Sequence, residues 1–135
     1  MAASIDLTAL PRLTSREAVG GELVSVDAEG GSAVARYQPP AQLANPIGSL
    51  QGGFAVAMLD DISGSTTWFA CGGRPFTTAQ ISVNFLQAVP MGEPLLGEAR
   101  IVQSGRRQAV VEAELKREED DSLLVRATVM NVFLK

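Results

Sequence analysis

An almost unbroken apolar run, Phe54 to Leu59, is followed directly by two acidic residues, Asp60 and Asp61. A helix that is apolar on nearly every side is not a surface helix, so we expect other parts of the fold to cover it on all sides. We therefore predict a central helix that starts at Gly52 and continues to about Phe69. A buried carboxylate without a partner is costly, so at least one of the two acids is expected to face water or to serve chemistry.

Downstream of this helix the pattern changes to an alternation with a period of two, which is typical of half-buried β-strands. In the first stretch, apolar positions alternate with polar ones: Ala79, Ile81, Val83 and Phe85 against Thr78, Gln80, Ser82 and Asn84. The other predicted strands are Glu22 to Ala28, Ser32 to Gln38, Leu95 to Gln103, Gln108 to Arg117 and Leu123 to Leu134. A short helix with its connection is expected between Ser4 and Gly20. One central helix with about six strands, largely antiparallel after the helix, predicts an α+β fold.

The composition indicates one globular domain over residues 1–135. Apolar residues make up 46% of the chain and charged residues 19%, which is typical of a globular protein and not of a disordered one. The net charge of −4 argues against general nucleic-acid binding, and an anionic ligand would need a local basic patch. With one cysteine, Cys71, and no histidine, carboxylates are the remaining metal ligands, and none has ligand spacing. We therefore expect no metal site.

The beginning of the chain lacks the basic region followed by an apolar core that marks a signal peptide. The longest apolar runs are far too short to span a bilayer. We expect a soluble, cytoplasmic protein without a membrane partner.

The start of the central helix carries two glycines, Gly52 and Gly53. Because they have no side chains, a ligand can approach their backbone N–H groups closely. The first N–H groups of a helix have no intrahelical partner and lie at the positive end of the helix dipole. They therefore suit an anion, or a carbonyl oxygen that is becoming one. A purely steric role, in a tight entry between packed backbones, is the alternative.

Gly52 and Asp60 are eight residues apart, which is about 12 Å along a helix axis at ~1.5 Å per residue. A reacting carbonyl must lie about 3 Å from both an oxyanion donor and a nucleophile or base. One helix cannot supply both groups to one carbonyl, so joint action requires two antiparallel helices across a two-fold axis, and hence at least a dimer. Because successive residues differ by about 100° around a helix, Asp60 and Asp61 are not expected to face one site.

The segment Asn45–Gly53 has the pattern Asn-x-x-Gly-x-x-Gln-Gly-Gly, followed by an apolar turn and Asp60. This pattern resembles the hot-dog-fold acyl-CoA thioesterases, especially the phenylacetate-pathway and THEM-like families, and the resemblance extends to about Phe133. It implies an antiparallel sheet wrapped around one long helix, and homodimers that often pair into tetramers. The implied reaction is hydrolysis of an acyl-CoA or aryl-CoA thioester to free acid and coenzyme A. Coenzyme A would be part of the substrate, so no separate cofactor is expected.

By position in the motif, the resemblance implies four catalytic roles. Asn45 matches a loop asparagine near the substrate or water, and Gly52 matches the glycine whose amide polarises the thioester carbonyl. Asp60 matches the acid that acts as nucleophile or general base, so we assign Asp61 a structural role. Thr78 matches a hydroxyl residue that helps to hold the attacking water.

Substrate binding is expected at three further places. Gly53 continues the pair of amides at the helix start. The acyl pocket is expected to be walled by apolar residues near Phe54, Met58, Phe76 and Phe85. Arg106 and Arg107, in a glycine turn, are candidates for the phosphates of coenzyme A, because guanidinium groups bind phosphate in a bidentate way; a solvated turn is the equal alternative.

One position departs from the family pattern, because Gln51 stands where these families usually have histidine. The chain has no histidine at all, which excludes a Ser-His-Asp triad and disfavours a hot-dog hydratase with an Asp-His pair. Glutamine can orient a carbonyl by hydrogen bonding but cannot move a proton. A non-catalytic acyl-CoA-binding protein is therefore the alternative function. Whether Asp60 attacks directly or activates water stays open at this point, as do the acyl group and the choice between dimer and tetramer.

Overall fold

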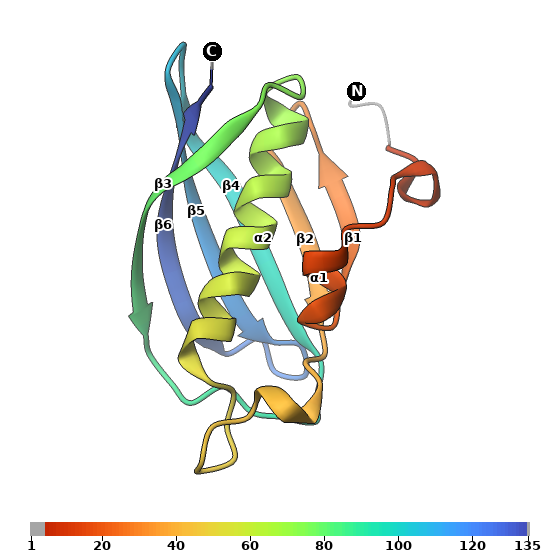
Figure 1. Cartoon of the computed structure of the whole chain (residues 1–135), viewed down its shortest axis with the longest axis vertical. Coiled ribbons are helices and arrows are strands. Elements are labelled where there is room, and N and C mark those ends of the chain that lie inside the picture. Colours follow the sequence, from red (N-terminus) through yellow and green to blue (C-terminus); the bar gives the residue numbers. More distant parts are fainter. Residues whose placement is uncertain (1–4, 135) are drawn as a thin grey trace.

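The computed structural model of the chain describes residues 5–134. Its centre is one long helix, α2 (Gly52–Ala70), packed against a six-stranded sheet (Figure 1). The strands are β1 (Gly21–Asp27), β2 (Ser32–Tyr37), β3 (Phe76–Phe85), β4 (Leu95–Ser104), β5 (Gln108–Arg117) and β6 (Leu123–Phe133). They are ordered β1-β2-β4-β5-β6-β3, and every neighbouring pair is antiparallel. This arrangement confirms the predicted α+β hot-dog fold.

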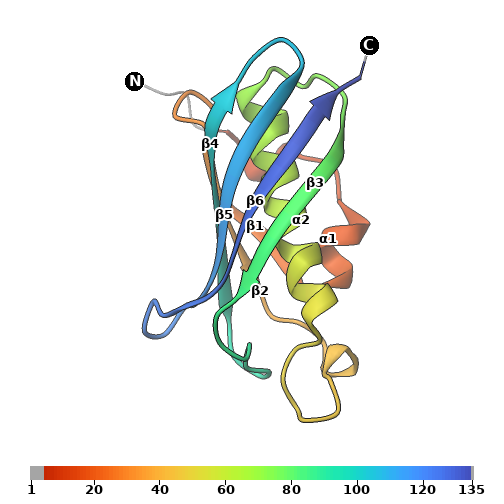
Figure 2. The same cartoon turned by 90° about the vertical axis from the view of Figure 1, so that its left-hand side faces the viewer.

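Three short helical segments complete the described chain: η1 (Leu7–Ala9), α1 (Thr14–Ala18) and η2 (Ala41–Leu43). The helix α1 falls within the segment that was expected to contain a short helix. Figure 2 shows α1 and α2 on the same side of the sheet. Among residues 5–134, no helix combines the length and the apolar character that a membrane crossing requires.

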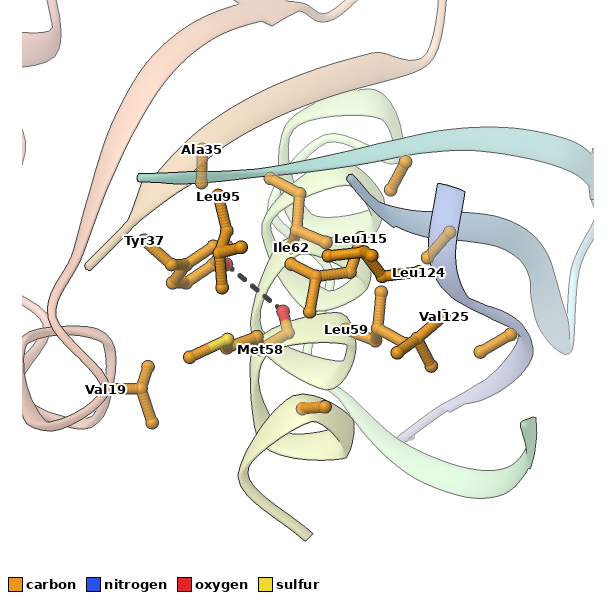
Figure 3. Close-up of a cluster of buried hydrophobic side chains, with 14 of the residues drawn as sticks. Val19, Ala35, Tyr37, Met58, Leu59, Ile62, Leu95, Leu115, Leu124 and Val125 are labelled. Carbon is orange, nitrogen blue, oxygen red and sulfur yellow. Dashed lines mark hydrogen bonds between the residues drawn. The ribbon is translucent and has the colours of Figure 1, made fainter. Parts of the chain in front are cut away.

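The core lies between α2 and the face of the sheet that is turned toward it (Figure 3). Helix residues Met58, Leu59 and Ile62 are fully buried there, against strand residues that include Leu95, Leu115 and Val125. The opposite side of α2 stays uncovered, with Phe54 36% and Trp68 45% exposed. The expectation of a helix covered on all sides is therefore wrong within one chain, because a single sheet covers only one side of a helix.

A bulge in β3 changes which of its side chains face the helix. The pairing of β3 with β6 shifts in register between Thr78 and Gln80. A bulge adds a residue to one strand and so shifts the inward–outward alternation beyond it. Thr78 therefore shares the half-buried face with Ile81, whereas Ala79 is exposed. The predicted alternation, which put Thr78 and Ala79 on the polar and the apolar face, is wrong on this side of the bulge.

Tyr37 is fully buried at the end of β2 and connects the sheet to the helix. Its ring lies between two glycines, since a Cβ at Gly21 in β1 or at Gly97 in β4 would come within 2.7 Å of it. Its hydroxyl lies 3.1 Å from the carbonyl oxygen of Met58 (Figure 3) and 2.6 Å from Oδ2 of Asp61. A phenol has one proton to donate, and the shorter contact, to the carboxylate, receives it.

Candidate active site

Asp60 meets β3 through Thr78, whose Oγ1 donates a hydrogen bond of 2.8 Å to Oδ1 of the carboxylate. The contact depends on the bulge in β3, which brings Thr78 onto the face turned toward α2. In the described part of the chain, no side chain donates to Oδ2 of Asp60. One carboxylate oxygen of Asp60 is thus held by the edge strand.

Asp60 and Thr78 line a cavity of about 440 Å³. The helix α2 and strand β3 form one side of it, with Gly64, Trp68, Phe69 and Phe76. The segment before and within α1 forms the other side, with Leu10, Pro11 and Leu13 among its residues. A mostly apolar cavity with a few polar groups is the usual form of a small-molecule site.

Asp61 is held by a different set of partners. Arg16 Nε donates to Asp61 Oδ2 at 2.8 Å, and the hydroxyl of Tyr37 donates to the same oxygen at 2.6 Å. Arg16 also donates through Nη2 to the hydroxyl of Ser65. The side chains of Arg16 and Asp61 are only 11% and 8% exposed, so this is a buried ion pair. Burial, together with the charge of Asp61, raises the pKa of Tyr37 far above its ordinary value of 10.0.

Both acids line the same cavity. The expectation that Asp60 and Asp61 could not face one site is therefore wrong, because the cavity is wide enough to reach from β3 across α2 to α1. The two residues nevertheless differ in their surroundings. Asp61 is paired with a guanidinium and a phenol, as expected of a structural residue, whereas Asp60 meets a single hydroxyl.

The start of α2 lies apart from this cavity. Gly52 is the first helical residue, and its N-cap, Gln51, makes no side-chain capping bond. A Cβ at Gly52 would lie 3.3 Å from the ring of Phe85, and a Cβ at Gly53 would meet nothing within 4 Å. Gly52 thus lies against an exposed aromatic ring, and Gly53 is open to solvent.

Asn45 closes the loop that leads into α2. Its Oδ1 accepts hydrogen bonds of 3.1 Å from the backbone N–H groups of Ile47 and Ser49. Its Nδ2 donates to the hydroxyl of Ser49 at 3.0 Å. This is the turn chemistry expected of asparagine before proline, and it engages Oδ1 and one of the two N–H groups of Nδ2.

Arg106 and Arg107 lie in the turn between β4 and β5, at the opposite end of the molecule from the start of α2 (Figure 1). Arg74 reaches the same turn, where its Nη2 donates to the carbonyl oxygen of Arg106 at 2.7 Å. Its guanidinium also lies 3.9 Å from the centre of the Phe133 ring. Among the described residues, none of these three arginines forms an ion pair, so the turn is a local cationic surface on an acidic protein.

The predicted pocket residues separate into three places. Phe76 lines the cavity beside Asp60. Met58 is fully buried under the sheet and belongs to the core, so its assignment to the pocket is wrong. Phe54 and Phe85 do not line this cavity in one chain; both are exposed, and Phe85 lies beside Gly52 at the helix start.

Among residues 5–134, no three or more His, Cys, Asp or Glu side chains are grouped so that they could hold a metal ion. Cys71 carries a free thiol, and burial raises its pKa.

Arg16 and Tyr37 were not among the predicted site residues. Tyr37 carried a usable signal, since it is the one tyrosine in the chain and occupies an inward position in a strand with Ala33 and Ala35. A buried phenol needs a partner for its hydroxyl, and a nearby acid is a natural one. Arg16 carried no such signal, because its partner Asp61 lies 45 residues away in the sequence.

The chain is similar to known proteins over most of its length. A sequence model described as the thioesterase superfamily matches residues 47–131. Acyl-coenzyme A thioesterase 13 from Homo sapiens is 21% identical over 118 residues, which cover 87% of this chain and 84% of that protein. Among solved structures, a phenylacetic acid degradation-related protein from Ralstonia eutropha JMP134 has a TM-score of 0.85 at 30% identity, covering 93% of this chain and 95% of its own. The protein smu.793 from Streptococcus mutans UA159, solved bound to acetyl CoA, has a TM-score of 0.77 at 25% identity, covering 84% of this chain and 88% of its own.

Proposed function

This chain belongs to the thioesterase superfamily, and we propose that it is a thioester hydrolase whose substrate is an acyl-CoA or aryl-CoA, cleaved to free acid and coenzyme A. The observation that carries the proposal is the Asp60 carboxylate, held by Thr78 at 2.8 Å on the wall of an apolar cavity. A thioester needs an oxygen nucleophile beside an apolar space for its acyl group, and this cavity offers both.

Asp60 serves the reaction by one of two routes. In the first, its Oδ2 attacks the carbonyl carbon, the carbon–sulfur bond breaks, and coenzyme A leaves as a thiolate that takes a proton from water. Water then hydrolyses the mixed anhydride and restores the carboxylate. In the second route, Asp60 takes a proton from water as the water attacks, and returns it to the leaving thiolate. In both routes the hydrogen bond from Thr78 keeps the carboxylate in position.

The oxyanion donor comes from a second copy of the chain. Gly52 and Asp60 belong to one continuous helix, so they are about 12 Å apart along its axis, too far to reach one carbonyl. The Gly52 N–H of one protomer, aided by Gln51, polarises the carbonyl that the partner's acid attacks. Asn45 and Gly53 support the same end of the substrate.

Two further observations support a homodimer, alone or as half of a tetramer. Exposed apolar side chains surround the start of α2, with Ile47 85%, Phe85 53% and Leu86 51% exposed. Such a patch is typical of an interaction surface. In addition, β3 is an edge strand with an unpaired side, which can pair with a second strand.

The coenzyme A moiety is bound by Arg106 and Arg107, assisted by Arg74. These arginines form a cationic turn on a chain of net charge −4, as anionic phosphates require. The structure of smu.793 with acetyl CoA supports this class of ligand.

The test is thiol release from short, medium, long and aromatic acyl-CoA thioesters by the native protein and by Asp60→Asn. We expect turnover to fall about 10²- to 10⁴-fold in the variant, with substrate binding retained. Asp121→Asn is the matched control, because Asp121 lies in an exposed turn with a φ of 61° that asparagine tolerates.

Turnover that survives Asp60→Asn would refute the assignment of the acid. Saturable binding of thioesters without any hydrolysis would instead make this chain an acyl-CoA-binding protein, with Gln51 marking the loss of turnover.

A further inference from the structure

The segment Leu10–Arg16 supplies six of the fifteen residues that line the cavity beside Asp60. The helix α1, which begins in this segment, buries none of its residues, and Leu13, just before the helix, is 46% exposed. The segment is therefore not part of the hydrophobic core. It instead forms the side of the cavity that faces α2 and β3.

Arg16 holds this segment in place. A helix of five residues without a side-chain cap is not stable by itself. Arg16 ties it to α2 through Nε to Asp61 at 2.8 Å and through Nη2 to Ser65. The stem of Arg16 packs closely over β1, since a Cβ at Gly21 would lie 2.8 Å from its Cγ. A second ion pair, between Arg12 of the segment and Glu17 of α1, is exposed and adds little.

Beyond the polar groups of Asp60, Asp61 and Thr78, the facing side of the cavity carries Gly64 and three aromatic residues, Trp68, Phe69 and Phe76. The absence of a side chain at Gly64 leaves space in the cavity. A Cβ at this position would point toward Phe76 and lie 3.6 Å from its ring. The volume of about 440 Å³ lies at the small end of ligand pockets.

We propose that Leu10–Arg16 is a fixed wall that limits the size of the acyl group, and that Arg16 is the positioning residue of this wall. The cavity then admits apolar acyl groups of medium size, an aryl group or a medium-length chain, and excludes long-chain acyl groups. This inference rests on the proposed function, because it assigns the cavity to the acyl part of a thioester.

Trp68 allows the cavity to be tested without turnover. It is the one tryptophan in the chain and lines the cavity, so its fluorescence reports on occupancy. Native protein is titrated with straight-chain carboxylic acids of increasing length and with phenylacetic acid. We expect the emission to respond to medium-length chains and to the aryl acid, with a loss of response at long chains. No response at any length, or a response that keeps strengthening to the longest chains, would overturn the proposal.

Variants of the wall should move this length limit. Leu10→Ala with Leu13→Ala widens the cavity and should extend the limit to longer chains. Gly64→Leu fills it from the α2 side and should shorten the limit. Leu134→Ala is the matched control, since Leu134 is 52% exposed and lies outside the cavity. A limit that the leucine double variant leaves unchanged would overturn the proposal, whatever Gly64→Leu does.

Arg16 is tested by Arg16→Met and Arg16→Lys with acyl-CoA substrates of several lengths. We expect Arg16→Met to raise KM severalfold for the preferred acyl group, with a smaller change in kcat. The variant should also discriminate less between medium-length and long acyl groups. Arg16→Lys should restore part of this discrimination, because lysine keeps the charge but not the two-armed contact. A fall in kcat with an unchanged length profile would refute the positioning role. If Arg16→Met does not fold, the leucine variants still decide whether the segment sets the limit.

The two proposals fail in different ways. If Asp60→Asn abolishes turnover but the wall variants leave the length limit unchanged, the proposed hydrolysis is supported and the role of Leu10–Arg16 as a wall is refuted. If no thioester is hydrolysed but the wall variants shift the Trp68 response, the role of Leu10–Arg16 as a wall is supported and the proposed hydrolysis is refuted.

Discussion

Thr78 Oγ1 and Asp60 Oδ1 lie 2.8 Å apart and join the edge strand of the sheet to the middle of the central helix. The two residues meet because the bulge between Thr78 and Gln80 brings the threonine onto the helix-facing side of β3. Asp60 therefore has a fixed carboxylate in a cavity that is otherwise mostly apolar.

Replacing Thr78 should slow turnover without removing the acid. We expect Thr78→Val to lower kcat about tenfold to a hundredfold, because a hydrogen bond to a charged group is worth about 1.5–3 kcal/mol. Thr78→Ser keeps the hydroxyl and should retain most of the activity. Steady-state kinetics on one acyl-CoA checks both variants, and equal losses in the two would show that the hydroxyl is not the cause.

Two substitutions at Gly52 separate the effect of losing its backbone N–H from the effect of adding a Cβ. Gly52 is the first residue of α2, and Gln51 before it has an extended backbone with ψ of 131°. Proline fits this helical position and its preceding residue well, and it removes the N–H. Alanine keeps the N–H and adds nearly the same Cβ, 3.3 Å from the Phe85 ring.

We therefore expect Gly52→Pro to lower kcat by about 10²- to 10³-fold, as is typical for the loss of one oxyanion donor, while Gly52→Ala loses far less. Circular dichroism and thermal unfolding should show both variants folded. Similar kinetics in the two variants would remove the amide from the mechanism.

The arginine turn should act on the nucleotide end of the substrate alone. We expect Arg106→Gln and Arg107→Gln each to raise KM for acyl-CoA about 1.4- to fivefold, since an exposed ion pair is worth ~0.2–1 kcal/mol. The effect should shrink as salt is added. The same acyl group on N-acetylcysteamine, which has no phosphates, is the control and should show no change. An equal effect on both thioesters would place the arginines outside coenzyme A binding.

The sequence predicted the frame of the molecule well, because the frame follows from repeating patterns. The apolar run from Phe54 and the glycines before it indicated the helix that is observed at Gly52–Ala70. Period-two alternation gave the strands, including β5 at its observed bounds, Gln108–Arg117. Both patterns express local periodicity, which a chain reveals without its neighbours.

The features of the cavity that were missed depend on contacts between distant segments. The bulge at Thr78 is set by pairing with β6, and the alternation of β3 alone gives no sign of it. The ion pair of Arg16 joins residues 45 positions apart. Met58 was placed in the pocket because apolar residues line both cores and pockets, and only the packing against the sheet distinguishes the two.

Tyr37 should make the fold sensitive to alkaline pH. Burial first, and then the charge and hydrogen bond of Asp61, raise the pKa of Tyr37 far above 10.0, while the charge of Arg16 lowers it less. Below pH 10 the phenol is protonated in both the folded and the unfolded chain, so the full stability is present. Above pH 10 the unfolded chain releases this proton and the folded chain keeps it. Stability should therefore fall as pH rises, by up to about 1.4 kcal/mol per pH unit for this one group.

Urea unfolding across this alkaline range measures the slope, and tyrosinate absorbance reports ionisation of the single tyrosine of the chain. We expect tyrosinate to appear together with unfolding and not before it. Tyr37→Phe is the control: it should be less stable near neutral pH by about 1.5–3 kcal/mol, because the bond to the Asp61 carboxylate is lost. The free energy of unfolding of Tyr37→Phe should also fall less steeply with pH in the alkaline range. The part of the fall that remains comes from Lys116, because its hydrogen bond to Glu98 raises its pKa. Tyrosinate that forms near pH 10 in the folded native protein would mean that the phenol is open to water and does not tie β2 to the helix.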